Sequence, residues 1–79
     1  MARRAYVKVV AEFSPEGAIR PLSVEWVDGR RFDVDRLLDV RRAAATKAGG
    51  QGMRYTVRIS GRETYLFDDN GRWFVEARE

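Results

Sequence analysis

The chain of 79 residues has neither cysteine nor histidine. Without cysteine it forms no disulfide bond and no thiolate metal site, so its stability depends on packing or on a partner subunit. Without histidine it lacks the side chain that most often acts as a general base at neutral pH. The two absences also remove the commonest zinc ligands. We therefore expect no catalytic residue, no metal and no cofactor, and we interpret the protein as a non-enzyme.

Long apolar runs are also missing. No segment approaches the roughly 20 apolar residues that cross a bilayer. Ala2-Arg3-Arg4 leads into an alternating segment and not into the apolar stretch of a signal peptide. We expect a cytoplasmic protein with no membrane contact. The length predicts a single domain, residues 1–79, with a thin core, because a chain of this size buries only about 60% of its unfolded surface.

Acidic residues occur in two close pairs, Asp33 with Asp35 and Asp68 with Asp69. Such pairs can share a metal or a hydrolytic site, but they are more typical of turns and helix caps, which is the interpretation we favour. The segment Thr46–Gly52 is too rich in glycine for regular structure. We interpret it as a mobile hairpin tip, with a backbone-amide nest for a ligand as the alternative.

Basic residues number 15, of which 13 are arginine, against 12 acidic residues, and the net charge is +3. A basic balance is typical of nucleic-acid-binding proteins. An arginine bias also arises from a GC-rich genome, and the acidic residues are interspersed with the basic ones. A mixed, solvated surface therefore stays open as the alternative.

The first part of the chain alternates between apolar and polar residues. Tyr6–Phe13 is predicted to be a half-buried strand, Ser14–Gly17 a turn, and Ala18–Val27 a second strand. Pro21 cannot donate to a strand ladder, so it belongs at an edge or at a bulge.

The next turn contains Asp28 and Gly29. A three-residue loop, Asp28–Arg30, keeps the apolar residues on one face. This loop sets Trp26 opposite Phe32 and Val24 opposite Val34.

The stretch after this hairpin is ambiguous. We favour a short turn near Asp35 followed by a strand over Leu37–Ala45. A helix through residues 41–45 is the alternative, because alanine and arginine favour helices.

The last part predicts a three-stranded meander over Met53–Arg78. Its turns are placed at Gly61-Arg62 and Asn70-Gly71, where two-residue hairpin loops need positive φ. This register sets Val57 opposite Leu66, and Phe67 opposite Phe74. One face is then apolar, with Met53, Tyr55, Val57, Ile59, Leu66, Trp73 and Val75. The other face mixes aromatic rings with arginines.

Several short strands bounded by turn signals indicate an all-β fold. We expect a small antiparallel sheet curled into a partly open barrel of about six or seven strands, because closure removes exposed edges. At most one short helical turn is expected.

The aromatic and arginine face of the meander is the candidate binding site. Exposed rings stack on bases and cationic groups hold phosphates in modules that bind single strands. We expect contact with single-stranded nucleic acid through Arg54, Arg58, Tyr65, Phe67, Phe74 and Arg78. Tyr6 and Lys8 extend this surface if the first strand joins the same sheet.

Two alternatives stay open. Phe67 and Phe74 can instead form a buried cross-strand pair, in which case Tyr55 and Trp73 become the exposed rings. The protein can also be an interaction or self-association module that uses an open sheet edge and exposed tryptophans, Trp26 and Trp73.

Four blocks of sequence carry a resemblance to a known group of proteins. The blocks are Trp26–Phe32, Val34–Arg41, Gly49–Val57 and Arg72–Glu76. They resemble a family of small, uncharacterised bacterial proteins, over about two-thirds of the chain. The resemblance implies a compact β-barrel and no catalytic residues. Related segments occur as tails of larger DNA-processing proteins, which implies nucleic acid or such a protein as the partner.

Overall fold

The computed structural model describes residues 2–44 and 51–78. These residues form eight strands and no helix. The strands are β1 (Ala2–Tyr6), β2 (Lys8–Phe13), β3 (Ile19–Glu25), β4 (Arg31–Asp33), β5 (Arg36–Ala44), β6 (Gln51–Ile59), β7 (Arg62–Asp69) and β8 (Arg72–Arg78).

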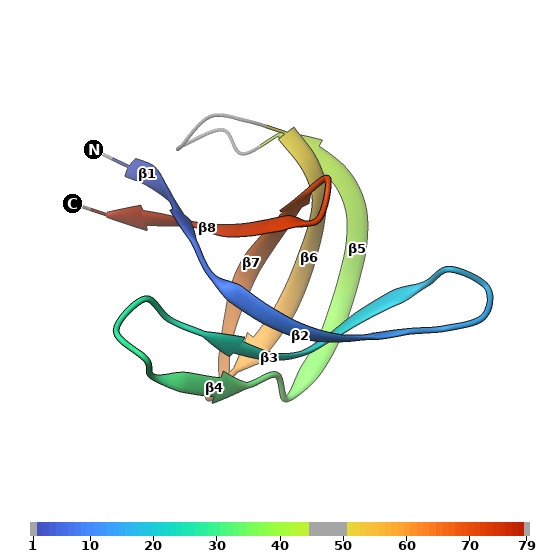
Figure 1. Cartoon of the computed structure of the whole chain (residues 1–79), viewed down its shortest axis with the longest axis horizontal. Helices are drawn as coiled ribbons and strands as arrows, with labels where there is room; N and C mark the ends of the chain where they lie inside the picture. The colour runs from blue at the N-terminus through green and yellow to red at the C-terminus, as the bar shows by residue number, and fades with distance from the viewer. Residues whose placement is uncertain (1, 45–50, 79) are drawn as a thin grey trace.

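The strands build two antiparallel sheets (Figure 1). The first has five strands in the order β1-β8-β7-β6-β5, and the second has three in the order β2-β3-β4. The all-β prediction is confirmed. The strand number is higher than predicted, because the first predicted strand is divided and β4 is separate from β5. The two sheets do not close into a barrel. None of the described residues lies in a helix long and apolar enough to cross a membrane.

The predicted strand Tyr6–Phe13 is divided at Val7, so that β1 joins the five-stranded sheet and β2 the three-stranded sheet. The backbone N–H of Val7 donates to the carbonyl of Trp73 at 3.0 Å. The N–H of Ser14 donates to Ala18, on the β3 side, at 2.9 Å. Because successive N–H groups of a strand point to opposite sides, β8 and β3 lie on opposite sides of this continuous β1–β2 stretch.

The turn over residues 14–17 is confirmed. Gly17 adopts a φ of 89° and its N–H donates to the carbonyl of Ser14 at 2.9 Å. The expectation for Pro21 is confirmed as well, since the register passes from Val10 opposite Ser23 to Ala11 opposite Pro21. Leu22 is therefore the extra residue of a bulge.

The hairpin that joins β3 to β4 differs from the prediction. Its loop is residues 27–29, because the N–H of Trp26 donates to the carbonyl of Arg30 at 2.8 Å. Val24 consequently lies opposite Phe32, and Trp26 does not. Gly29, at the third loop position, adopts a φ of 89°, as the left-handed position of a three-residue loop requires. The shift by one loop residue changes every pair but leaves each side chain on its predicted face.

The ambiguous stretch is a strand, and the helical alternative is wrong for its described part. β5 begins at Arg36 and runs antiparallel to β6, with a bulge at Leu38 between the pairs of Leu37 and Asp39. Residue 45, the predicted end, lies outside the described residues.

The predicted glycine-rich loop is shorter than expected, because Gln51 and Gly52 already belong to β6. Residues 46–50 lie outside the described residues. A Cβ added at Gly52 would collide with the carbonyl oxygen of Asp68, so β6 and β7 approach here as closely as only glycine allows.

The turn between β6 and β7 is Ser60-Gly61 and not Gly61-Arg62. Ser60 and Gly61 adopt φ values of 50° and 78°, the pattern of a type I′ turn, in which glycine favours the second position. Tyr55 therefore lies opposite Leu66. The turn at Asn70-Gly71 is confirmed, with φ values of 52° and 86°, and so is the pairing of Phe67 with Phe74.

The main core lies between the two sheets. Its buried members are Ala5, Val24, Tyr55, Val57, Leu66 and Val75. All but Val24 belong to the five-stranded sheet, and they lie on the face of that sheet that was predicted to be apolar. We call this apolar face of the five-stranded sheet its inner face, and the opposite face of the same sheet its outer face.

Candidate nucleic-acid interface

The outer face carries the aromatic and arginine residues that the sequence indicates. Strand pairing places together the side chains that share this face. Its arginines are Arg4, Arg36, Arg41, Arg54, Arg58 and Arg72, its acidic residues are Asp39, Glu63, Asp69 and Glu76, and its rings are Tyr6, Tyr65, Phe67 and Phe74. Arginine thus outnumbers acid on a face drawn from five strands.

Phe67 and Phe74 form the centre of this face. Their rings stack with centroids 5.1 Å apart and planes 11° from parallel. Their exposed fractions are only 1% and 0%. They form a second small core, separate from the main one. The prediction that these two rings are open for stacking on bases is therefore wrong, because both rings are buried in the free protein.

Arg4, Tyr6 and Arg72 border this pair on the β1 side. Tyr6 packs edge-on against Phe74 with centroids 5.8 Å apart. The guanidinium carbon of Arg4 lies 5.7 Å from the Phe74 centroid and 6.0 Å from that of Tyr6. Arg72 lies 4.5 Å from the centroid of the exposed Tyr6 ring. Two arginines therefore converge on one exposed ring.

Arg54 and Tyr65 border the pair on the β6 side. The guanidinium carbon of Arg54 lies 4.5 Å from the Tyr65 centroid, and Tyr65 is 46% exposed. The Nε atom of Arg54 is buried and has no hydrogen-bond partner. A buried donor without a partner is uncommon in folded proteins. Arg4, Tyr6, Arg54, Tyr65 and Arg72 are called the arginine–tyrosine strip below.

The remaining predicted site residues are placed as follows. Arg58 is exposed at the outer face, opposite Arg36 on one side and Glu63 on the other. Arg78 ends β8, and its side chain lies outside the described residues. Lys8 does not extend the surface, because it belongs to β2, where its Nζ lies 4.0 Å from Glu25.

Arg4 and Arg72 were missed from the sequence. Each lies two residues before a ring of its own strand, Arg4 before Tyr6 and Arg72 before Phe74. This spacing puts arginine and ring on one face of a strand. The signal for Arg4 lay outside the predicted first strand, which began at Tyr6.

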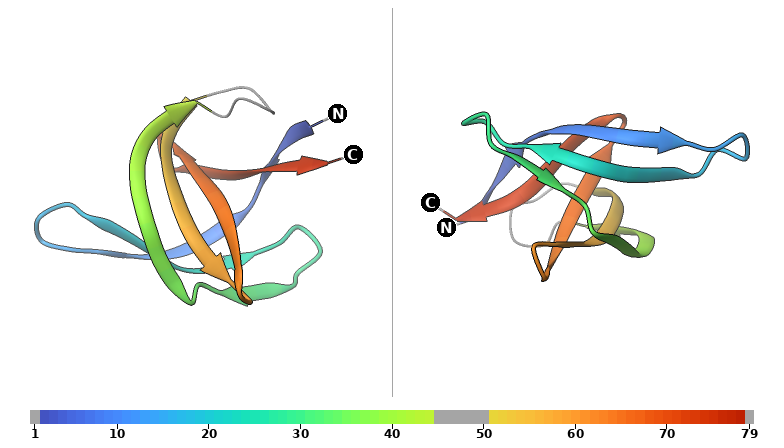
Figure 2. Two further views of the ribbon diagram at one scale, coloured as in Figure 1. Left: turned by 180° about the vertical axis from the view of Figure 1, so that it is seen from behind. Right: turned by 90° about the horizontal axis from the view of Figure 1, so that it is seen from below.

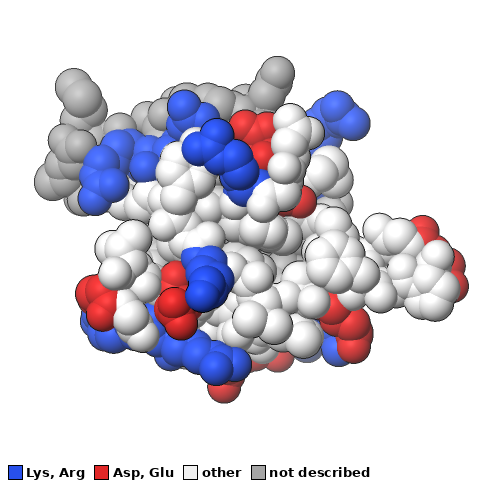
Figure 3. Space-filling model, viewed as in Figure 1, with Lys and Arg blue, Asp and Glu red and all other residues white. Residues whose placement is uncertain are grey.

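Charge is mixed over the rest of the surface. In Figure 3 the blue groups gather along the top of the molecule, on the side where β1 and β8 run in Figure 1, and red and blue groups alternate lower down. Several exposed acids have local arginine partners, including Asp28 with Arg30 at 2.8 Å and Asp39 with Arg41 at 2.7 Å.

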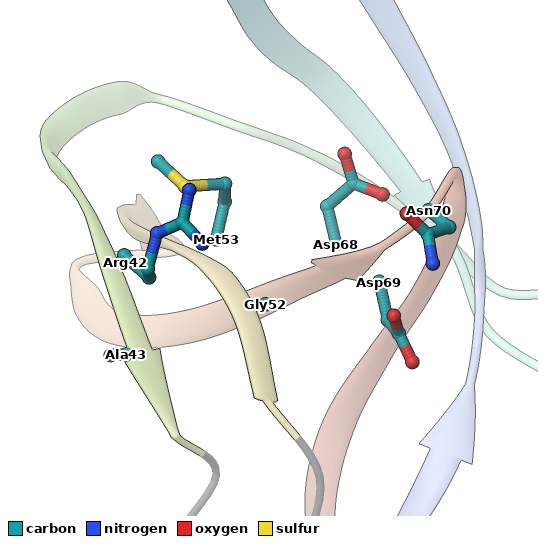
Figure 4. Close-up of a pocket in the computed structure, with 7 residues that line it drawn as sticks. All are labelled: Arg42, Ala43, Gly52, Met53, Asp68, Asp69 and Asn70. Atoms are coloured by element: carbon teal, nitrogen blue, oxygen red, sulfur yellow. The ribbon is translucent and has the colours of Figure 1, made fainter.

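A pocket of about 490 Å³ lies near the far end of the meander (Figure 4). Asp68 and Asn70 lie on one side of it and Arg42 and Met53 on the other. The lining contains one arginine and two aspartates, Asp68 and Asp69, so the pocket offers no net attraction for phosphate. The carboxylate of Asp68 also accepts the N–H of Gly71 at 2.8 Å, which is the turn-forming role favoured for this pair.

Asp68 also affects the ionisation of the buried Tyr55. Burial raises the pKa of the Tyr55 hydroxyl, and the negative charge of Asp68 raises it further. Among the residues that the structure describes, no three acidic side chains gather to hold a metal ion.

The tryptophans do not form an exposed pair. Trp26 and Trp73 are half-buried and pack against the main core. The Trp73 ring lies 5.0 Å from that of Tyr55, which is buried too. The prediction of exposed tryptophans at an interaction surface is therefore wrong. The alternative in which Phe67 and Phe74 form a buried cross-strand pair is confirmed, but its expectation that Tyr55 and Trp73 become exposed is wrong.

No protein family, curated protein or solved structure matches the chain. The resemblance to small bacterial proteins stays a prediction.

Proposed function

We propose that the outer face binds single-stranded nucleic acid and carries out no chemistry of its own. The observation that supports this most directly is the arginine–tyrosine strip. Three guanidinium groups lie against aromatic rings on one face, and two of those rings, Tyr6 and Tyr65, are exposed.

The chemistry of the strip fits this ligand. A base stacks on a tyrosine face or on a guanidinium plane, and this contact is worth about 1–3 kcal/mol per base. A guanidinium group that lies over a ring still has N–H groups that can donate to phosphate oxygens.

The buried phenylalanine pair has a supporting role in this proposal. Phe67 and Phe74 fill the centre of the strip, so the surrounding arginines and tyrosines rest on a packed floor. A floor of this kind lowers the entropy lost on binding, because side chains that are already positioned need less ordering. The two sheets joined through the β1–β2 stretch then act as a partly open barrel that presents one sheet face, as small barrels that bind single strands do.

Affinity for labelled single strands tests the proposal. The wild-type protein should bind DNA and RNA oligonucleotides of about 16 nucleotides, with affinity falling steeply as salt rises. The variant Tyr65→Ala should lose about 10-fold in affinity at unchanged salt dependence, because it removes a stacking surface. The variant Arg54→Gln should lower both the affinity and the slope of its logarithm against the logarithm of salt concentration, by about 0.7 for one lost phosphate contact.

Arg20→Gln is the matched control. Arg20 lies on the other sheet, where it pairs with Glu12 at 3.2 Å, and its loss changes the net charge by the same amount as the loss of Arg54. An equal effect of the two substitutions would show general charge attraction and no site. Absence of binding by the wild-type protein at micromolar concentration and low salt would remove the proposal.

A further inference from the structure

The two sheets separate at the end where β6 turns into β7. The right view of Figure 2 shows this turn standing away from β3 and β4. A pocket of about 360 Å³ lies at this end, lined by residues of the β3–β4 hairpin and of the β6–β7 hairpin. Sites for small molecules have volumes of roughly 300–1,000 Å³ and are mostly apolar, with a few polar groups that orient the ligand. We call this hollow the inter-sheet pocket.

The three-stranded sheet supplies one wall of the inter-sheet pocket. Val24 lies opposite Phe32 in the strand ladder. Two residues nearer the loop, the N–H of Trp26 donates to the carbonyl of Arg30 at 2.8 Å. Val24 is 2% exposed and belongs to the main core, whereas Trp26 and Phe32 are half-buried. Because Arg30 is exposed, this wall passes from an apolar floor to a basic rim.

The β6–β7 hairpin supplies the opposite wall. Ile59 lies opposite Arg62, and Thr64 is the next β7 residue on the same face. Ile59 is half-buried and packs against the main core, whereas Arg62 is exposed. This wall therefore repeats the order of the first, apolar toward the core and basic at the outside. The hydroxyl-bearing side chains of Ser60 and Thr64 complete the lining.

The charge of the inter-sheet pocket is positive. Among the described residues, its lining contains two arginines and no acid. Arg30 is held in place, since its Nε donates to Asp28 at 2.8 Å and its guanidinium carbon lies 5.8 Å from the Phe32 centroid. Arg62 has no acidic partner within the part of the chain that the structure describes. Because Asp28 balances Arg30, the charge of Arg62 remains to attract an anionic group.

We propose that the inter-sheet pocket binds a small aromatic carboxylate. The ring of such a ligand packs against Trp26 and Phe32, where aromatic pairs gain a contact in addition to the burial of apolar area. Its carboxylate stays at the rim, where Arg62 donates charge-assisted hydrogen bonds. No lining residue belongs to the arginine–tyrosine strip, so this site is independent of nucleic-acid binding.

Nuclear magnetic resonance of the isotope-labelled protein locates the ligand. The chain has two tryptophans, of which Trp26 lines the inter-sheet pocket and Trp73 does not. Titration with cinnamate should shift the indole N–H signal of Trp26 and leave that of Trp73 unchanged. Cinnamyl alcohol has the same ring and no charge. It should bind about 10-fold more weakly, because it lacks the hydrogen bonds between charged groups.

Removal of one charge tests the role of Arg62. Arg62→Gln should raise the dissociation constant for cinnamate about 10-fold and leave that for cinnamyl alcohol unchanged. Arg31→Gln is the matched control, because Arg31 precedes Phe32 on β4 and projects from the other face. It removes the same charge and should change neither constant, and the spectra should show both variants folded.

Three results would overturn the proposal. The first is an indole signal of Trp26 that does not move at millimolar cinnamate. The second is equal affinity for the acid and the alcohol, which would show an apolar hollow with no selection for charge. The third is an equal effect of Arg62→Gln and Arg31→Gln, which would show attraction by the net charge and no placed arginine.

Discussion

The two faces of the five-stranded sheet bury their apolar residues in different ways. The inner face packs against the three-stranded sheet, and its core is aliphatic except for Tyr55. Among the described residues, no second sheet packs against the outer face, yet Phe67 and Phe74 are buried there as completely as Leu66 is on the inner face. Arg4 and Tyr6 lie against Phe74, with long polar side chains that take the place of an apolar layer.

This difference shows that a sheet face whose sequence mixes arginines with aromatic residues can still contain a buried core. Arginine has a long apolar stem and a flat, weakly hydrated guanidinium group, so it covers a ring and still keeps its charge near water. The outer face is therefore at once a packing surface and a charged surface. The buried part of the inner face is a packing surface.

The largest expected effect is the loss of stability when a buried side chain in either of the two cores is truncated to alanine. Leu66→Ala on the inner face should lower the free energy of unfolding by about 2–5 kcal/mol, and Phe74→Ala on the outer face by about 3–5 kcal/mol. Both side chains are fully buried, so both leave cavities. Urea unfolding followed by circular dichroism measures the two values.

Phe74→Leu keeps most of the side-chain volume, and it replaces Phe74→Ala in the unfolding measurement if the alanine variant does not fold. A cost below about 1 kcal/mol for Phe74→Ala would contradict the second core, since a buried phenylalanine cannot be truncated so cheaply. Val40→Ala, at an exposed position of β5, provides the surface reference.

The next effect is the dependence of stability on alkaline pH, which involves Tyr55, the buried tyrosine of the inner face. Burial, with the charge of Asp68 adding to it, raises the pKa of the Tyr55 hydroxyl in the folded state. The unfolded chain therefore ionises this tyrosine first. Its contribution to stability is complete below the ordinary tyrosine pKa of about 10 and is lost as the pH rises above that value toward the folded-state pKa.

Tyr55→Phe should accordingly flatten the loss of stability at alkaline pH. The measurement is the free energy of unfolding in urea at a series of pH values around and above about 10. A decline in Tyr55→Phe as steep as in the wild-type protein would assign the alkaline sensitivity to other groups.

The smallest expected effect concerns the arginine cover of the outer face. Arg4→Ala should lower the free energy of unfolding by about 0.5–1 kcal/mol, because it removes a cation above Phe74 at a partly exposed site. Arg31→Ala, on exposed β4, is the matched control and should change stability less. Equal values for the two variants would show that Arg4 contributes charge but no packing.

Faces were easier to predict than partners. In two hairpins, near Gly29 and Gly61, the predicted loop began one residue too late, and all the cross-strand pairs changed. Each error shifted the partner of every strand residue by two positions along the opposite strand. Because side chains alternate between the two faces with a period of two, a shift of two positions leaves every side chain on the same face. Trp26 and Tyr55 therefore kept their predicted faces although their partners changed.

Burial was harder to predict, because it depends on contacts far away in the sequence. Alternation groups Phe67 with Phe74 and Tyr65, but it does not show which groups lie above them. The covering residue Arg4 is distant in sequence from Phe74 and arrives only because β1 pairs with β8. The strand break at Val7, which sends Tyr6 to one sheet and Lys8 to the other, has no proline or glycine to mark it.

The pairing of β1 with β8 also determines when folding can finish. These are the first and last strands in the described sequence, and they lie side by side at the edge of their sheet (Figure 1). As the chain leaves the ribosome, β1 emerges long before its partner has been synthesised. Ala5 and Tyr6 therefore stay without their β8 partners, and accessible to chaperones and to other nascent chains, until the last strand has been synthesised.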